Sequence, residues 1–570
     1  MKGMFKRALA GVAAAALAAT GLALGAGAAN AKVLTAGDTT VTLNAEYAAQ
    51  FTGHTYKAIK IADYDVYGES PKQVFTLKTV DGIKTQVTAA VNAAIAPDTV
   101  PTDPAGIDPL AWAQQQDKPK LDKSVDSPYL GNGTTRKLAD ALRDSIGDSA
   151  SPLVGPNDVQ EGSAGTITVE GKTAEITFNS PGLWLILDQS KVDATDTATG
   201  SSKAVPMLVG TPLTINKTDA SEGTVISNGT ANVKNQVVSI AKTVDDNTVQ
   251  QRENAKYTLS TKIPNYVGYK VQGYQFTVTD KFAKDAPMKY AAGTLNVYVN
   301  SIDDKNKLTI DTDYTVTGFD QSSKTFTVDL SKYIKRLGFG TDEPGENDTF
   351  KVGTLVGTPV IVTYEATVTG STGPDGALNT PSLTYPNDPT SNESKGKVPG
   401  PGVKVFNFDY TIVKKDKTTG TPLQGATFVI YADGGSATAP LQTVTTGADG
   451  TAKFTGLSDD VIYIIEETAA PTGYMDVNLK FKLDIDAVIE GANENATVGP
   501  VTYKVTDDSL HLVSDGNTST VTVENVKNIT ELPLTGAAGT MLFTVVGLLI
   551  AGAGALVYAK SRGVKRALRG

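Results

Sequence analysis

The segment FNFDYTIVKKDKTTGTPLQGATFVIY, residues 406–431, decides the fold of the C-terminal part of the chain. Successive residues of a β-strand point to opposite faces of a sheet. The residues from Phe408 to Ile412 that share a face with Lys414 are therefore apolar, whereas Lys415 points the other way. Lys414 ends an apolar stripe, and the pattern predicts a strand whose buried face carries an amine.

Two later segments carry polar groups on apolar stripes of the same kind. In STVTVEN, residues 519–525, Asn525 shares a face with two valines. In VIYIIEET, residues 461–468, Glu467 aligns with Val461, Tyr463 and Ile465, although Ile462 and Ile464 make that strand ambiguous. Burial lowers the pKa of a lysine towards the neutral amine and raises that of a carboxyl. One interpretation is a nucleophilic amine beside a protonated acid; the other is a hydrogen-bonded Lys–Glu pair with an asparagine nearby.

These segments, together with DGTAKFTGL and YIIEETAAPTGY, resemble a CnaB-type, prealbumin-like domain. Such domains commonly join a lysine on the first strand to an asparagine on the last through a side-chain amide, assisted by a buried glutamate. The resemblance implies an isopeptide bond between Lys414 and Asn525, and it selects Glu467 as the acid/base.

The middle of the chain repeats this pattern in SIAKTVDD, FTVTDKF and GALNTPSLTYPNDP. We call the alternation of side chains between the two faces of a strand its parity. Strand parity places Lys242 and Asp280 within apolar stripes, and Asn379 shares a face with Leu383 further along its strand. These segments resemble the isopeptide-forming middle domain of Gram-positive backbone pilins. The resemblance implies a Lys242–Asn379 bond with Asp280 as acid/base. Asn387 has the same parity and is an alternative acceptor, and an ordinary buried polar cluster is the other interpretation.

Both ends of the chain indicate export to the cell surface. A basic start, an Ala/Leu-rich stretch and the small residues Ala29-Asn30-Ala31 predict a cleaved signal peptide over residues 1–31. Residues 540–558 carry no charge, and at ~1.5 Å per residue they span roughly 28 Å, about one hydrocarbon core. The basic residues Lys560, Arg562, Lys565 and Arg566 follow, which predicts a cytoplasmic C-terminus.

The pentapeptide LPLTG precedes this apolar segment. Its order with the apolar span and the basic tail resembles the cell-wall sorting signal of Gram-positive surface proteins. The resemblance implies that a sortase recognises Leu532 and Pro533, cuts between Thr535 and Gly536, and joins Thr535 to an amine. The alternative is an ordinary single-pass anchor that follows a chance Leu-Pro turn.

The amine that receives the threonine is a further expectation. Backbone pilins usually carry a Val-Tyr-Pro-Lys-Asn motif between their first and middle domains, and this chain has Val233-Lys234-Asn235-Gln236 there, without the Tyr-Pro. Lys234 shares its parity with polar neighbours, so we expect it to be exposed. The resemblance implies that Lys234 is the inter-subunit linkage site; the alternative is a solvated surface lysine without a function.

Composition shifts divide the exported part of the chain. Short alternating Val/Thr/Tyr segments between Gly/Asn/Asp turns predict an all-β class of tandem immunoglobulin-like (Cna-type) β-sandwich domains, between the signal peptide and a C-terminal transmembrane helix. We expect one helix near residues 136–147 and a turn at DYDVYGE, residues 63–69. The predicted domains are an N-terminal pilin domain at 32–236, a middle domain at 237–396, a C-terminal CnaB-type domain at 403–530 and a sorting region at 532–570.

Composition also argues against several classes of function. The formal net charge of −10 argues against a nucleic-acid partner. The chain has no Cys, so disulfides cannot reinforce it, and His54 and His511 show no ligand spacing, so we expect no metal and no cofactor. No Ser/His/Asp or Cys/His set stands out at recognisable spacing. A surface enzyme is therefore weakly supported, and we expect that the protein is not an enzyme.

The resulting hypothesis is a structural shaft subunit of a covalently polymerised pilus. Its expected partners are a pilus-specific sortase, other copies of itself, tip and basal pilins, and peptidoglycan, with host receptors as further candidates. The expected location is the cell-wall surface, after a transient stage in the plasma membrane. The alternative is a monomeric wall-anchored adhesin that binds host matrix or glycans.

Overall fold

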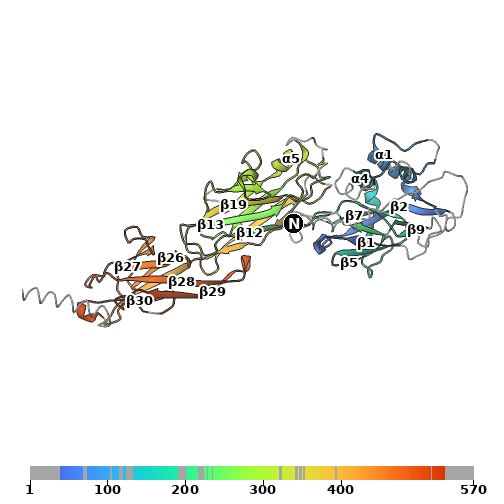
Figure 1. Cartoon of the computed structure of the whole chain (residues 1–570). Helices are drawn as coiled ribbons and strands as arrows, with labels where there is room; N and C mark the ends of the chain where they lie inside the picture. The colour runs from blue at the N-terminus through green and yellow to red at the C-terminus, as the bar shows by residue number, and fades with distance from the viewer. Residues whose placement is uncertain are drawn as a thin grey trace, which may run out of the picture.

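The structure is a computed structural model that describes residues 39–532, except for residues 68–73, 103–105, 115–119, 123–132, 191–199, 216–223, 228, 234, 320–323, 341–344, 346–348, 351–352, 390, 392–393 and 515. Three strand-rich regions follow one another along the molecule (Figure 1). We call them the N-terminal region (residues 39–236), the middle region (237–405) and the C-terminal region (406–532), according to the sheets that they form.

The N-terminal region is built on a mixed sheet with the order β11-β1-β6-β5-β4-β2-β7-β8, in which β3 pairs with β2. These strands are β1 Thr40–Asn44, β2 Tyr56–Tyr67, β3 Val74–Thr79, β4 Ser151–Val154, β5 Gly165–Glu170, β6 Thr173–Phe178, β7 Leu183–Asp188, β8 Met207–Gly210 and β11 Thr230–Asn232. A separate ribbon pairs β9 Leu213–Ile215 with β10 Thr224–Ser227.

Helices α1 Lys84–Ile95, α2 Pro109–Ala113 and α4 Thr134–Ile146 pack on this sheet (Figure 1). The predicted helix at 136–147 corresponds to α4, whose Leu138, Leu142 and Ile146 recur at helical spacing and are buried. The sequence interpretation missed α1. Its buried Val87, Val91 and Ala94 are separated by other small residues, which leaves a weak amphipathic pattern.

The middle region is a sandwich of two sheets, with the orders β12-β13-β19-β15 (β16 pairs with β19) and β17-β18-β14-β20-β21 (β22 pairs with β20). Its strands are β12 Ile240–Val244, β13 Asn254–Lys262, β14 Thr277–Phe282, β15 Met288–Tyr290, β16 Asn296–Val299, β17 Thr315–Thr317, β18 Thr325–Asp329, β19 Pro359–Val368, β20 Ala377–Pro386, β21 Lys395–Pro399 and β22 Val403–Val405, with helix α5 Ser331–Phe339. Strand β19 alternates between buried and half-buried residues along its length, so one face lines a shared core.

The C-terminal region pairs a small sheet, β26-β23-β30, with a larger one, β25-β24-β27-β28-β29. Its strands are β23 Phe408–Asp416, β24 Thr427–Ala432, β25 Gln442–Thr445, β26 Thr451–Leu457, β27 Tyr463–Ala469, β28 Lys480–Glu490, β29 Thr497–Thr506 and β30 Thr520–Asn525. The predicted all-β sandwich class is confirmed. The ambiguity of β27 has a physical cause: Ile464 packs on the outer face against Val429 and Tyr431, so both faces of this strand are covered.

Two details differ from the sequence interpretation. The turn predicted at residues 63–69 is wrong for residues 63–67, which form the end of β2 and pair with β3, because Asp63 and Asp65 alternate with Tyr64 and Val66 at a strand period. The Pro/Gly-rich link at 395–404 contributes β21 and β22, which both pair with β20. The middle sheet therefore extends to Val405.

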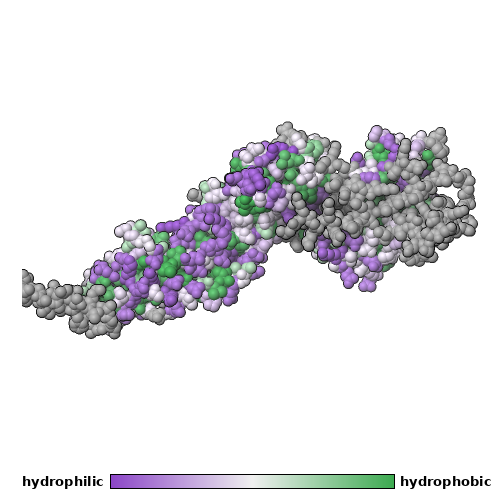
Figure 2. Space-filling view, viewed as in Figure 1, coloured by the Kyte–Doolittle hydropathy of each residue, from purple (hydrophilic) through white to green (hydrophobic). Residues whose placement is uncertain are grey.

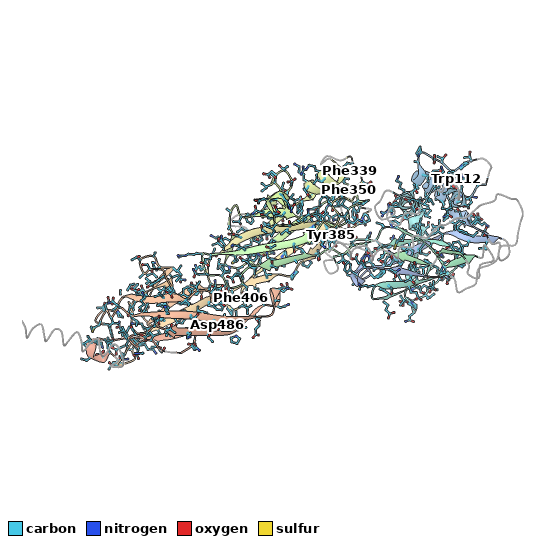
Figure 3. All side chains as sticks on the ribbon, viewed as in Figure 1. Trp112, Phe339, Phe350, Tyr385, Phe406 and Asp486 are labelled. Carbon is cyan, nitrogen blue, oxygen red and sulfur yellow. The ribbon has the colours of Figure 1, made fainter. Side chains whose placement is uncertain are left out.

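Side chains and backbone join neighbouring regions. At the first junction, the Tyr385 hydroxyl donates to the Ser201 carbonyl (3.0 Å). At the second, the Phe406 amide donates to the Asn247 carbonyl (2.7 Å) and the Tyr463 hydroxyl to Gln250 Oε1 (2.8 Å). Figure 3 labels Tyr385 within the middle region and Phe406 where the middle and C-terminal regions meet.

On the visible face of the middle and C-terminal regions, apolar residues are scattered among hydrophilic ones (Figure 2). The part of the chain that the structure describes contains no helix long and apolar enough to cross a bilayer. The predicted signal peptide at 1–31 and the predicted span at 540–558 lie outside the described residues.

Candidate functional site

The middle region buries a lysine, an aspartate and an asparagine together. Lys242 on β12, Asp280 on β14 and Asn379 on β20 are each at most 2 % exposed. The Lys242 amine donates to Asp280 Oδ2. β14 and β20 are neighbours in one sheet, whereas β12 belongs to the other, so the lysine approaches both partners from the opposite sheet.

Tyr364 on β19 completes this cluster, and the sequence interpretation did not include it. Its hydroxyl oxygen accepts from Lys242 Nζ (2.7 Å) and from Asn379 Nδ2 (2.6 Å), and it donates to Asp280 Oδ1 (2.8 Å). The Asn379 Oδ1 atom is buried and has no hydrogen-bond partner among the described residues. The four side chains therefore form one connected network around the asparagine carboxamide.

Burial and the neighbouring Asp280 act in opposite directions on the pKa of the Lys242 amine. Burial lowers the pKa of Lys242 to about 8, although Asp280 opposes the change. The Lys242 amine also lies 4.6 Å from the centroid of the Tyr257 ring. Burial raises the pKa of Tyr364 well above its usual value, so its hydroxyl keeps its proton at neutral pH. A neutral amine is thus accessible next to a carboxamide.

The alternative acceptor, Asn387, lies elsewhere. It follows the end of β20, and its Oδ1 accepts from the Ser394 hydroxyl (2.8 Å). Its backbone carbonyl accepts from the Lys203 amide (2.7 Å) at the junction with the N-terminal region. The geometry therefore favours Asn379 as the partner of Lys242.

The C-terminal region buries a second cluster of the same residue types. Lys414 on β23 and Asn525 on β30 are both 0 % exposed, and Glu467 on β27 is 3 % exposed. Lys414 Nζ donates to Glu467 Oε2 (2.9 Å) and to the Glu524 carbonyl (3.2 Å). Asn525 Nδ2 donates to Glu467 Oε1 (3.4 Å), so the one carboxyl group contacts both partners.

Strand pairing explains why Lys414 and Asn525 meet. β23 and β30 are adjacent and parallel, with Lys414 opposite Val523 and Asp416 opposite Asn525. Residues two apart share a face, so Lys414 and Asn525 are diagonal neighbours. Burial lowers the pKa of Lys414 and raises that of Glu467, although each opposes the change in the other.

The N-terminal region holds a buried polar cluster that the sequence did not indicate. His54 Nδ1 lies 2.7 Å from Asp188 Oδ2, and His54 Nε2 lies 2.9 Å from Ser201 Oγ. Ser201 is only 3 % exposed, so this Ser–His–Asp chain is buried. The Asn235 side chain donates to the Gln50 carbonyl (2.8 Å) next to the histidine. The cluster ties the end of the N-terminal region together, and no sequence spacing relates these positions.

The remaining predicted residues belong to the sorting motif and to the expected inter-subunit linkage. Leu532 packs partly buried against the C-terminal core. Lys234, Pro533, Thr535 and Gly536 lie outside the described residues. Among the residues that are described, no group of three or more His, Cys, Asp or Glu side chains is arranged to hold a metal ion.

Comparison with known families identifies two modules of the chain. Residues 408–497 match the model of the SpaA prealbumin-like fold domain, and residues 524–565 match the LPXTG cell wall anchor motif. The predicted resemblances of these two segments are thereby confirmed. The chain is a cell-wall-anchored surface protein with a prealbumin-like domain in front of its anchor.

Solved structures similar to this chain include Gram-positive pilins. The T6 backbone pilin of Streptococcus pyogenes is 14 % identical (TM-score 0.47), with 87 % of this chain and 100 % of that chain covered. The major pilin SpaA of Corynebacterium diphtheriae is 18 % identical (TM-score 0.44), covering 86 % and 100 %. BcpA of Bacillus cereus is 17 % identical (TM-score 0.36), covering 63 % and 89 %. No curated protein sequence matches the chain.

Proposed function

We propose that this chain is the shaft subunit of a covalently polymerised pilus, reinforced by two intramolecular isopeptide bonds. The observation that carries the proposal is the pair of buried Lys–carboxyl–Asn clusters in successive β-sandwiches ahead of a cell wall anchor motif. In this proposal the chain has the predicted N-terminal, middle and C-terminal domains ahead of the sorting region, and the pairing of β21 and β22 with β20 extends the middle domain to Val405.

Each bond forms once and releases one ammonia. The neutral amine of Lys414 attacks Cγ of Asn525; the Nζ–Cγ bond forms, the Cγ–Nδ2 bond breaks, and Glu467 transfers protons between them. Lys242, Asp280 and Asn379 react in the same way in the middle region. The reaction removes a buried amine and a buried carboxyl charge. Because the desolvation of these groups is unfavourable, their removal favours the formation of the amide.

Assembly uses the two remaining residues. A sortase cleaves after Thr535 and joins its carbonyl to Lys234 of the next subunit, and the last subunit is joined to a basal pilin or to peptidoglycan. The covalent path under tension then runs through residues 234–242, 379–414 and 525–535. Most of the middle and C-terminal sandwiches lies outside this path, so force does not need to be resisted by their strand pairing.

The polymer itself tests the linkage. Cells that produce the Lys234→Arg variant should lose the high-molecular-weight ladder but keep wall-anchored monomer, whereas the control Lys397→Arg, an exposed lysine of β21, should keep the ladder. A ladder that persists in Lys234→Arg contradicts the linkage. A wild-type protein that never forms a ladder favours the alternative, a monomeric wall-anchored adhesin.

The intact mass tests the internal bonds. The mature protein should be lighter than the sum of its residues by two molecules of ammonia. The Lys242→Ala and Lys414→Ala variants should each be lighter by only one. A mass equal to the full sum would exclude both bonds.

A further inference from the structure

The hydroxyl of Tyr364 lies between the lysine, the aspartate and the asparagine of the middle region. Its oxygen lies 2.7 Å from the attacking atom, Lys242 Nζ, 2.6 Å from the leaving atom, Asn379 Nδ2, and 2.8 Å from Asp280 Oδ1. All of these side chains are buried, so water does not readily replace any of them. No hydrogen bond joins Asp280 directly to the Asn379 carboxamide among those that the described residues make.

We propose that Tyr364 is a catalytic residue of isopeptide formation, which relays a proton from Asp280 to the leaving nitrogen of Asn379. This inference rests on the proposed function, because it assigns a step in the formation of the Lys242–Asn379 bond. It adds a fourth member to the three residues that the sequence indicated.

The relay balances its protons. Lys242 first gives a proton to Asp280, leaving a neutral amine and a protonated acid, and the amine then attacks Cγ of Asn379. Asp280 passes its proton to the Tyr364 oxygen while the Tyr364 proton moves to Nδ2, and ammonia departs. A second proton leaves the new amide nitrogen and returns to Asp280, which ends neutral in a site that no longer holds a cation.

The position of the hydroxyl is well suited to this step. A phenol can accept two hydrogen bonds and donate one, and Tyr364 does so with all three reacting groups. Burial keeps the pKa of Tyr364 high, so it acts as a shuttle that regains its proton and does not remain a phenolate. Its ring stacks on Tyr257 at 5.1 Å between centroids, which holds the hydroxyl in place.

The test compares two tyrosines in the same core. Full-length Tyr364→Phe and Tyr274→Phe chains are extracted from cells that lack the sortase; the Tyr274 hydroxyl is also buried and has no hydrogen-bond partner among the described residues. After a pulse of isotope-labelled lysine, mass spectrometry follows the tryptic peptide that joins Lys242 to Asn379. We expect this bond to form about 100-fold or more slowly in Tyr364→Phe and at the wild-type rate in Tyr274→Phe.

Each outcome decides a different point. Tyr364→Phe that cross-links at the wild-type rate overturns the relay and leaves the proposed function intact. A wild-type chain without the Lys242–Asn379 peptide overturns the proposed bond itself. If Tyr364→Phe does not fold by circular dichroism, a fluorotyrosine placed at residue 364 keeps the hydroxyl and alters its acidity. A changed rate then supports the relay, and an unchanged rate overturns it.

Discussion

The middle and C-terminal regions connect a buried lysine, a carboxyl group and an asparagine through different side chains. In the C-terminal region, Glu467 contacts both Lys414 and Asn525 with its two carboxyl oxygens. In the middle region the acid is an aspartate, one methylene shorter, and the Tyr364 hydroxyl connects it to the asparagine. For the proposed bonds, the comparison implies that the acid has to be connected to the carboxamide, and that an aspartate with a phenol takes the place of a glutamate.

The two clusters also differ in what they join. Lys414 and Asn525 lie on adjacent parallel strands of one sheet. Lys242 and Asn379 lie on opposite sheets of a sandwich. A bond in the C-terminal region would therefore reinforce a strand pair, whereas a bond in the middle region would hold two sheets together.

The largest expected effect comes from removing the attacking amine in the C-terminal region. Lys414→Ala should retain one ammonia and lower the free energy of unfolding by about 4–5 kcal/mol, because the bond closes a loop of roughly 110 residues. Guanidinium unfolding and intact mass measure the two effects. Lys415→Ala, on the opposite face of β23, is the matched control and should change neither. A Lys414→Ala protein as stable as wild type would contradict the role of this bond.

The second prediction concerns a variant that removes the contact between the acid and the carboxamide. Glu467→Asp shortens the acid where the described structure has no hydroxyl in the position of Tyr364, so the Lys414–Asn525 bond should form about 100-fold more slowly. Pulse-labelling and mass spectrometry of the cross-linked peptide measure the rate. Glu466→Asp, whose side chain points to the other face, is the control. Equal rates in the two variants would show that contact with Asn525 is not required.

The reverse exchange sharpens the comparison. Asp280→Glu combined with Tyr364→Phe gives the middle region the acid of the C-terminal region and removes the phenol. The double variant should cross-link about 10-fold faster than Tyr364→Phe alone, because the longer acid reaches the carboxamide directly. The same peptide assay compares the two, with circular dichroism to confirm folding. A folded double variant that is no faster would contradict the equivalence of the two arrangements.

The smallest effect is a pH dependence in a middle region that cannot cross-link. In Asn379→Ala, Lys242 stays an amine whose pKa burial lowers from 10.5 to about 8. Between these two pH values the unfolded chain binds more protons than the folded chain, so the free energy of unfolding should rise with pH. The same stability should be lost as the pH falls through about 8. Denaturant unfolding from pH 7 to pH 11 measures this. Asn379→Ala/Lys242→Met is the control, and an identical pH profile for both would contradict the lowered pKa.

Strand parity was sufficient to select most of the candidate site. It distinguished Lys414 from Lys415, and it placed Lys242 and Asp280 on apolar stripes that are indeed buried. It could not choose between Asn379 and Asn387, because both have the same parity. The choice depends on where β20 ends, since Asn387 lies beyond Pro386 and turns to Ser394.

The sequence by itself determined which side chains face inward, because a strand alternates its faces over a distance of two residues. The anchor motif could also be identified from the sequence, since its residues are contiguous. Only the tertiary structure decided which inward groups meet. Tyr364 joins Lys242 and Asn379 across two sheets, and His54 meets Asp188 and Ser201 from distant strands and loops. These contacts depend on how sheets pair and stack, and parity carries no information about the facing partner.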